Sequence, residues 1–263
     1  AEPYAYFYWQ ATVDAHKGAR WEWEASYVDQ LNRPLGKPLG PYVRDNKVYT
    51  RSFEHCDVYM DLRPEPNSEH ITRILWKNDI GGAVPAGGGY SRTDDRYILQ
   101  GGGAFAGSSD QCFYLSDAHY GDGAVKVSVD AMKDAPDAKA GLMFRESLAA
   151  DAAMVAVLRD AEGRIYMIYR NAQGGGLARA GSANGRHHAY AMITRKGDVF
   201  AGYASADGKQ WTRIAEVTVP MNEKIEMGMT VASYRRGGLA TAAFSGFERV
   251  EPSSSREAVA EDG

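Results

Sequence analysis

The stretch AKAGLMFRES (138–147) carries a charged side chain at the end of an otherwise apolar segment. If Leu142 and Phe144 face one side of a β-sheet, strand alternation sends Met143 and Arg145 to the other side, among apolar neighbours. A desolvated guanidinium group without a partner is very costly. We therefore expect Arg145 to hold either a ligand or an internal acid, such as the adjacent Glu146.

A second group that could do chemistry is the run Trp21-Glu22-Trp23-Glu24. In an extended strand both glutamates point to one face and both tryptophans to the other. Glycosidases use two carboxylates on opposite sides of the bond they cleave, whereas these two would lie on one wall of a cleft. Glu22 and Glu24, with Asp14 and the nearby His16, are therefore candidate catalytic residues, against the alternative of an aromatic layer with solvated acids.

Acids in the predicted loops could hold a structural calcium ion, because calcium prefers oxygen ligands from turns, although EF-hand spacing is absent. The candidate ligands are Asp110, Asp122 and Asp134, with Asp117 and Asp137 beside them. His187 and His188 would point to opposite faces of a strand, so we expect them at the surface or in a turn rather than on one ion.

Composition bounds the class of protein. Among 263 residues, 44% are hydrophobic and the net charge is -4, so we expect a globular chain without the basic footprint of a nucleic-acid-binding protein. No apolar run approaches the roughly 20 residues that cross a bilayer. Two cysteines, Cys56 and Cys112, allow one disulfide at most, and two free buried thiols are the expectation.

From about Val125 onward the chain reads as a series of short strands. VKVSVDAM (125–132) alternates apolar and polar residues, and AAMVAVLR (152–159) is apolar on both faces, as in a central strand. Gly197-Asp198 and Asp207-Gly208 are typical hairpin turns, and we expect Trp211 after the second turn to pack in the core. This succession predicts an antiparallel sandwich.

The first 78 residues differ, with four of the five tryptophans and segments such as NRPLGKPLGPYV (32–43) that fit neither helix nor central strand. KVYTRSFEHCDVYMDL (47–62) predicts a hairpin and HITRILWKN (70–78) a closing strand. Glycine density rises sharply after Asn78, which places a boundary near 78 to 82. The polar tail 251–263 is expected to be disordered.

The order of segments over about 79 to 250 resembles a known family. The matching runs are NDIGGAV (78–84), SSDQCFYLSDAHYGDGAVKVSVDAM (108–132), AKAGLMFRES, IYMIYRNAQGG (165–175), FAGYASADGKQW (200–211) and MGMTVASYRRGGLATAAFSGFERV (227–250). They resemble the concanavalin-like jelly-roll domain of unknown function labelled "regulation of enolase protein"-like. That family is common at the C-termini of secreted bacterial glycan-degrading enzymes, and its modules are usually taken as sugar-binding or accessory domains.

The N-terminal segment looks like the closing end of a glycoside hydrolase barrel, with ASYVDQLNRPLGKPLGPY (25–42), VYTRSFEHCDVYMDL (48–62) and ITRILW (71–76) in that order. Such a barrel needs about 250 residues or more, so this segment would be only its end. The expected architecture is therefore all-β: a β and irregular segment over 1–78, a concanavalin-like antiparallel jelly-roll sandwich over 79–250, and a tail over 251–263.

With this fold, Tyr166 and Arg170 share one side of their strand, and a jelly roll leaves one sheet face concave. Rings stack on the face of a pyranose, and guanidinium groups bind hydroxyls or a uronate. The predicted ligand face comprises Arg145, Tyr166, Arg170, Tyr203 and Tyr234.

The resemblance implies a secreted, monomeric module that binds a polysaccharide or oligosaccharide. The alternatives are a glycoside hydrolase or polysaccharide lyase that uses the N-terminal carboxylates, and a non-catalytic structural or adhesion domain.

Overall fold

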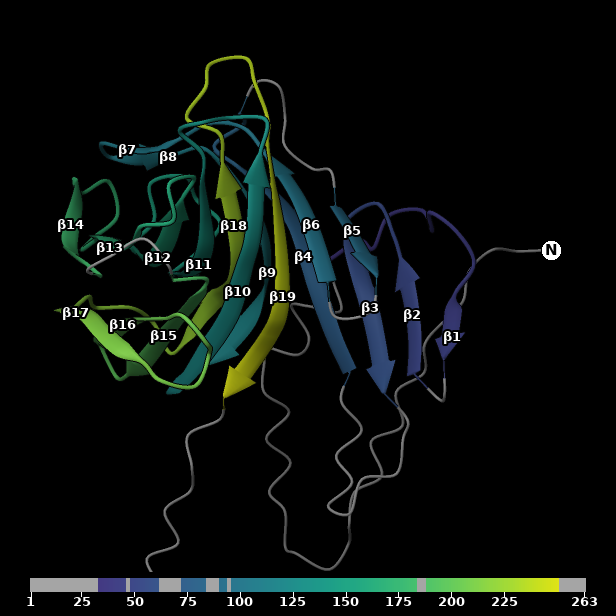
Figure 1. Cartoon of the computed structure of the whole chain (residues 1–263). Coiled ribbons are helices and arrows are strands. Elements are labelled where there is room, and N and C mark those ends of the chain that lie inside the picture. Colours follow the sequence, from purple (N-terminus) through teal and green to yellow (C-terminus); the bar gives the residue numbers. More distant parts are fainter. Residues whose placement is uncertain are drawn as a thin grey trace, which may run out of the picture. The chain divides into compact units, whose positions relative to one another are not determined.

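The computed structural model describes residues 33–45, 48–61, 72–83, 90–93, 96–183 and 188–250, and these residues form an all-β, concanavalin-like antiparallel sandwich (Figure 1). In spatial order the larger sheet contains ten strands: β1 (Val43–Asp45), β2 (Val48–Ser52), β3 (Cys56–Asp61), β4 (Thr72–Ile80), β9 (Cys112–Tyr120), β18 (Lys224–Ala232), β11 (Lys139–Arg145), β12 (Met154–Asp160), β13 (Ile165–Arg170) and β14 (Leu177–Ser182). The fold class predicted from the strand pattern is therefore confirmed.

The smaller sheet contains seven strands in the order β17 (Thr212–Thr218), β16 (Val199–Ser205), β15 (Tyr190–Lys196), β10 (Gly123–Lys133), β19 (Ala240–Val250), β6 (Arg96–Gly101) and β5 (Tyr90–Thr93). A separate hairpin consists of β7 (Phe105–Ala106) and β8 (Ser109–Asp110). No helix of the described residues is long and apolar enough to cross a membrane.

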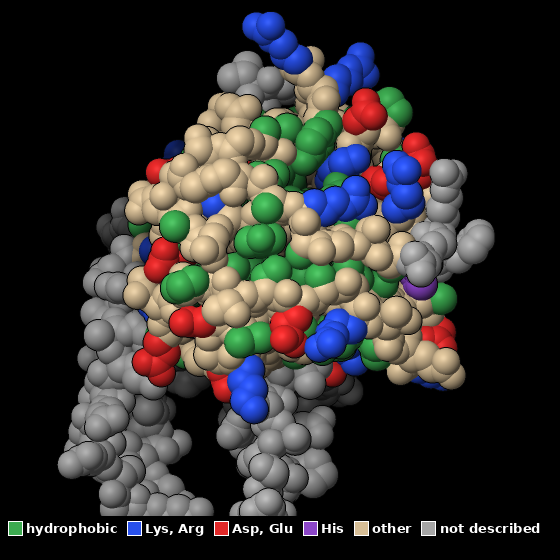
Figure 2. Space-filling view, turned by 90° about the vertical axis from the view of Figure 1, so that its left-hand side faces the viewer, with side chains coloured by type: hydrophobic (Ala, Val, Ile, Leu, Met, Phe, Trp, Pro, Cys, Tyr) green, Lys and Arg blue, Asp and Glu red, His purple; other side chains and the backbone are tan. Residues whose placement is uncertain are grey.

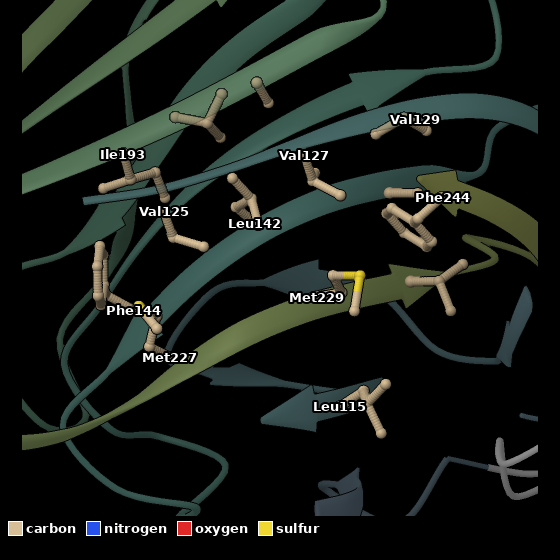
Figure 3. Packing of buried hydrophobic residues seen from close by; sticks show 14 of the residues in the cluster. Leu115, Val125, Val127, Val129, Leu142, Phe144, Ile193, Met227, Met229 and Phe244 are labelled. Carbon is tan, nitrogen blue, oxygen red and sulfur yellow. The ribbon is translucent and has the colours of Figure 1, made fainter. Parts of the chain in front are cut away.

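The hydrophobic core lies between the two sheets, where alternation on each strand sends one set of side chains inward. Leu142 and Phe144 of β11 meet residues of the other sheet such as Val127 and Phe244. Figure 3 shows side chains of both sheets packed in this layer. The same alternation places Met143 and Arg145 on the outer face of the larger sheet, as predicted.

The predicted hairpin turns are present. Lys196 pairs with Val199 across Gly197-Asp198, and Gly197 has a φ of 58°, which the turn requires. In the next turn the Asp207 carboxylate accepts hydrogen bonds from the backbone N–H groups of Gln210 and Lys209, which lower its pKa to about 2. Trp211 does not pack in the core as expected, because it is only partly buried and belongs to none of the core clusters.

The residues before position 80 continue the larger sheet. β4 pairs with β9 from Trp76 opposite Ser116 to Ile80 opposite Cys112, and residues from Leu35 onward form one compact unit. The predicted hairpin over β2 and β3 and the closing strand β4 are present. The sequence placed a boundary near 78 to 82, but β4 runs through residue 78, and the glycines that suggested a boundary form a turn in which Gly81 and Gly82 have positive φ.

One side of the sandwich is bordered by two edge strands, β14 and β17, which contact each other. Each has a register shift against its neighbour, at Met167/Ile168 and at Gly202/Tyr203. Such bulges bend an edge strand and protect it from pairing with other chains. Figure 2 faces this side and shows a hydrophobic strip, consistent with the partly buried Ala180, Ala183, Ile214, Ala215 and Val217 of this region.

Candidate functional site

The two arginines singled out in the sequence lie in one row on the outer face of the larger sheet. Arg145 ends β11 and Arg170 ends β13, and both pair with Met154 of the intervening strand β12. Because residues paired across neighbouring strands point to the same face, the two guanidinium groups reach the same space.

Asp110 of the β7–β8 hairpin occupies that space. Its Oδ2 lies 2.7 Å from Nη1 of Arg145 and 2.7 Å from Nη1 of Arg170, and its Oδ1 lies 2.7 Å from Nη2 of Arg170. All three side chains are 0% exposed. Arg145 and Arg170 therefore serve as internal counter-ions, and their guanidinium groups do not face an open surface where they could bind a ligand. The partner is Asp110 and not the neighbouring Glu146 that the sequence suggested.

Both guanidinium groups also donate to backbone carbonyls, whereas Nε of Arg145 is buried without a hydrogen-bond partner among the described residues. Arg145 donates to the carbonyl oxygens of Ala149 and Ala150, and Arg170 donates to those of Ala152 and Gly175. Charge-assisted hydrogen bonds of this kind are stronger than neutral ones. The ion cluster Asp110–Arg145–Arg170 thus fastens the β7–β8 hairpin and two loops onto the sheet.

Apolar packing on this outer face also holds the β7–β8 hairpin against the sheet. Phe105 of the hairpin packs with Met143 and Met154 in a second core cluster, against which Leu148 and Tyr234 also lie. This end of the outer face is therefore covered by the chain itself, and the same cluster includes Tyr166, which is 8% exposed.

Beside this covered end lies a cluster of two aromatic rings and two cations, contributed by β11, β13, β14 and the loop after β18. Arg179 is exposed, Lys139 and Tyr234 are partly buried, and Tyr166 is 8% exposed. The Cζ of Arg179 lies 4.6 Å from the ring centroid of Tyr166. The Nζ of Lys139 lies 5.2 Å from the ring centroid of Tyr234 and 6.0 Å from that of Tyr166. We call Lys139, Tyr166, Arg179 and Tyr234 the cation–aromatic cluster. Within about 6 Å of a ring centroid, a cation is attracted by the negative face of the ring.

Tyr234 is held in place from both its backbone and its side chain. Its φ is 54°, a conformation uncommon for a residue other than glycine. Its N–H donates to the carbonyl of Gly103 and its hydroxyl donates to the carbonyl of Phe105, 3.1 Å away. Phe105 pairs with Asp110 across the β7–β8 hairpin. The ion cluster therefore positions the hairpin on which Tyr234 rests, and burial raises the pKa of Tyr234 to about 12.

The acids nearest to this cluster are engaged elsewhere. Asp160 accepts from Nε of Arg164 at 2.8 Å and from the backbone N–H groups of Glu162 and Arg164. Although burial opposes ionisation, the hydrogen bonds from Arg164 hold the pKa of Asp160 below its ordinary value. Glu162 also pairs with Arg164. Within the described part of the chain, no carboxylate lies within 4 Å of Lys139 or Arg179.

The five residues predicted to share a ligand face do not all do so. Tyr166 and Tyr234 come together, but Tyr203 lies on the outer face of the smaller sheet, because its neighbours Phe200 and Ala204 on β16 point into the core. The prediction of one shared surface is therefore wrong for Tyr203, in addition to the burial of the two arginines.

The candidate catalytic residues Glu22, Glu24 and Asp14, with His16, lie outside the described residues, as do His187 and the tail 251–263. The catalytic hypothesis for them stays a prediction.

The candidate calcium ligands each hold a different partner in the protein. Asp110 binds the two arginines, Asp122 accepts from the N–H of Gly197, and Asp134 accepts from the hydroxyl of Thr241. The described residues contain no group of three or more metal-ligating side chains. Calcium binding stays a prediction, for which titration with the ion is the test.

Both cysteines are buried and free, as expected. Burial is the main cause that raises the pKa of each thiol to about 12. A thiol with such a pKa is almost wholly protonated at neutral pH, so neither is a candidate nucleophile.

Sequence reasoning missed Asp110 as a counter-ion and missed Lys139 and Arg179 altogether. Asp110 stands 35 and 60 positions from its two arginines, so no local pattern connects them. Lys139 and Arg179 look like ordinary solvent-facing strand residues. Lys139 could have been found, because it lies on the same face of its strand as Arg145, which the sequence already assigned to the outer face.

No protein family model matches this sequence, and no curated protein matches it either. Similar solved structures show the fold. A functionally unknown protein from Saccharomyces cerevisiae is 16% identical with a TM-score of 0.51, over 65% of this chain and 98% of that chain. A β-1,3-1,4-glucanase (lichenase) derived from a mouse hindgut metagenome is 10% identical with a TM-score of 0.42, over 62% of this chain and 83% of that one.

A xylan β-1,4-xylosidase from Bacillus halodurans C-125 is 11% identical with a TM-score of 0.42, and the match covers 84% of this chain but 56% of that enzyme. The likeness to the Saccharomyces cerevisiae structure, with a TM-score of 0.51, supports the fold alone. None of these matches supports the "regulation of enolase protein"-like family in particular.

Proposed function

We propose that this chain is a carbohydrate-binding or accessory β-sandwich module of a secreted glycan-degrading protein. The observation that carries the proposal is the cation–aromatic cluster on the outer face of the larger sheet. Tyr234, which is partly exposed, supplies ring surface for the C–H face of a sugar ring, and Lys139 and Arg179 supply donors for its oxygens. Tyr166 is 8% exposed and supports Arg179 from below. A few fixed polar groups beside apolar surface are typical of small-ligand sites.

The cluster is also well positioned. Three of its residues stand on β11, β13 and the edge strand β14 of the larger sheet, and Tyr234 is fastened through the β7–β8 hairpin to the buried ion cluster. A preordered site loses less conformational entropy on binding than a mobile one. The geometry therefore favours recognition of a ligand over a merely solvated surface.

The test compares two partly exposed tyrosines, Tyr234 in the loop after β18 and Tyr203 on the outer face of the smaller sheet. We would measure binding of the protein to a glycan array and to insoluble polysaccharides, with and without calcium, for the natural chain, Tyr234→Ala and Tyr203→Ala. The natural chain should bind at least one glycan, Tyr234→Ala should weaken that binding about tenfold, and Tyr203→Ala should leave it unchanged. Circular dichroism checks that both variants fold. Absence of any binding, or an equal loss in Tyr203→Ala, contradicts the proposal.

The hydrolase or lyase alternative depends on Glu22, Glu24 and Asp14, outside the described residues, so no contact favours it. The structural or adhesion alternative predicts no binding to any glycan, and the same array decides between it and the proposal.

A further inference from the structure

We propose that the cation–aromatic cluster selects acidic sugar residues, with a carboxylate or sulfate group held between Lys139 and Arg179. The inference rests on the proposed glycan-binding function and names the class of glycan. It follows from the charges that the cluster leaves without an acid partner.

Lys139 and Arg179 face aromatic rings in place of acids. Arg179 stacks on Tyr166 and Lys139 stands near both rings, but neither cation has a carboxylate within 4 Å among the described residues. The aromatic contacts fix the positions of the charges without neutralising them. A fixed cation that has not been neutralised binds an anionic group more strongly than a neutral hydroxyl, because the hydrogen bond is charge-assisted.

Asp160 is the acid nearest to Lys139, and the two charged groups are more than 4 Å apart. Although burial opposes ionisation, hydrogen bonds from Arg164 and, less strongly, the ammonium group of Lys139 lower the pKa of the Asp160 carboxyl. Asp160 stands opposite Lys139 in the register of β12, but its oxygens accept from the turn that contains Arg164 and Glu162. Arg164 in turn pairs with both acids, at 2.8 Å for Asp160 and 3.3 Å for Glu162. These hydrogen bonds and ion pairs hold the oxygens of Asp160 and the guanidinium group of Arg164 in the β12–β13 turn.

Further positive charge follows Tyr234 directly in the chain. Arg235 and Arg236 are exposed, and neither has an acid within 4 Å among the described residues. Figure 2 shows Lys and Arg side chains beside the hydrophobic strip on this side of the molecule, with Asp and Glu side chains among them.

The experiment pairs each acidic ligand with its neutral counterpart. Calorimetry would measure binding of polygalacturonate and its carboxyl-reduced form, and of dextran sulfate and dextran, at physiological salt. The first pair reports a carboxylate and the second a sulfate. We expect the full chain to bind at least one acidic ligand about tenfold or more tightly than the neutral form.

The variants separate specific contacts from general electrostatics. Lys139→Met and Arg179→Met should each remove most of the preference for the acidic ligand, whereas Lys139→Arg and Arg179→Lys should retain part of it. Lys209→Met is the matched control, because it removes the same unit of charge from an exposed turn on the smaller sheet. An equal loss in Lys209→Met, or equal binding of a single-stranded oligonucleotide, overturns the inference in favour of non-specific polyanion binding.

The failure of this inference is distinguishable from the failure of the proposed function. If the chain binds neutral glycans as tightly as acidic ones, glycan binding stands and acidic selectivity is wrong. If it binds neither kind, both are wrong.

Discussion

Replacing Asp110 by asparagine tests the buried ion cluster. The change keeps the size of the side chain but removes the carboxylate that pairs with both guanidinium groups, and it turns amide hydrogens towards N–H donors that lie 2.7 Å from the present oxygens. Removing one partner of a buried ion pair costs about 3–5 kcal/mol, because the remaining charge is left desolvated. Asp110→Asn leaves two such charges, so we expect a loss at or above this range.

Arg145→Met should cost less. Asp110 then keeps its two bonds to Arg170, and the carbonyls of Ala149 and Ala150 that lose a donor lie in a partly exposed loop. Lost hydrogen bonds to a charged group cost about 1.5–3 kcal/mol. The exposed pair Arg213–Glu216 provides the control, since its side chains are 60% and 50% exposed and Glu216→Gln should cost about 0.5 kcal/mol.

Urea unfolding at pH 7, followed by far-UV circular dichroism, gives the three free energies of unfolding. The order Asp110→Asn, Arg145→Met, Glu216→Gln, from largest to smallest loss, is the expected result, and an Asp110→Asn protein that does not fold agrees with it. The reasoning is refuted if the free energy of unfolding of Asp110→Asn lies within about 1 kcal/mol of that of the natural chain. A smaller loss of stability for Asp110→Asn than for Arg145→Met also refutes it.

Three further predictions concern titration, thiol reactivity and packing. Burial lowers the pKa of His119 to about 4, from 6.5 when unfolded. The unfolded state therefore takes up the proton first, and stability should fall by about 3 kcal/mol as pH drops from 6.5 towards 4. A pH series of urea unfolding for the natural chain and His119→Gln measures this loss, and parallel curves would show that His119 contributes nothing. Cys56 and Cys112 should not react with a thiol reagent in the native protein but should both react in denaturant, and rapid native labelling would contradict their burial. In Gly228→Ala the new Cβ would lie 2.0 Å from a carbonyl oxygen of the neighbouring strand, whereas in Gly176→Ala it would meet nothing within 4 Å. Thermal unfolding should show a loss of about 1–3 kcal/mol for the first and almost none for the second, and similar midpoints would refute the contact.

The strand series and its turns could be predicted from sequence, because a half-buried antiparallel strand imposes a period of two on its residues. The same pattern placed Arg145 on the outer face and required a partner for it. It could not say which partner, since Asp110 reaches the cluster from a hairpin of two-residue strands that produces no periodic signal.

Alternation also leaves the choice of sheet undetermined. It separates inward from outward residues on a strand, but both sheets of a sandwich have an outer face. Tyr166 and Tyr203 follow the same outward pattern on β13 and β16, which belong to opposite sheets. The sequence therefore predicted Tyr166 as a site residue but did not predict its cationic neighbours Lys139 and Arg179.

The predicted boundary near 78 to 82 was also inferred from a local signal. A local rise in glycine content marks a change of direction, and at Gly81 and Gly82 that change is a turn after β4. Only the long-range pairing of β4 with β9 shows that the earlier strands belong to the same sheet.

The most direct test of the central claim is an NMR titration of the arginine Nε–H signals with an acidic oligosaccharide such as trigalacturonate. The account predicts that the Arg179 signal shifts, together with ring signals of Tyr166 and Tyr234, while the signal of Arg213 on the smaller sheet stays in place. Shifts confined to Arg213 and Tyr203, or no shift at a saturating concentration of ligand, would contradict it.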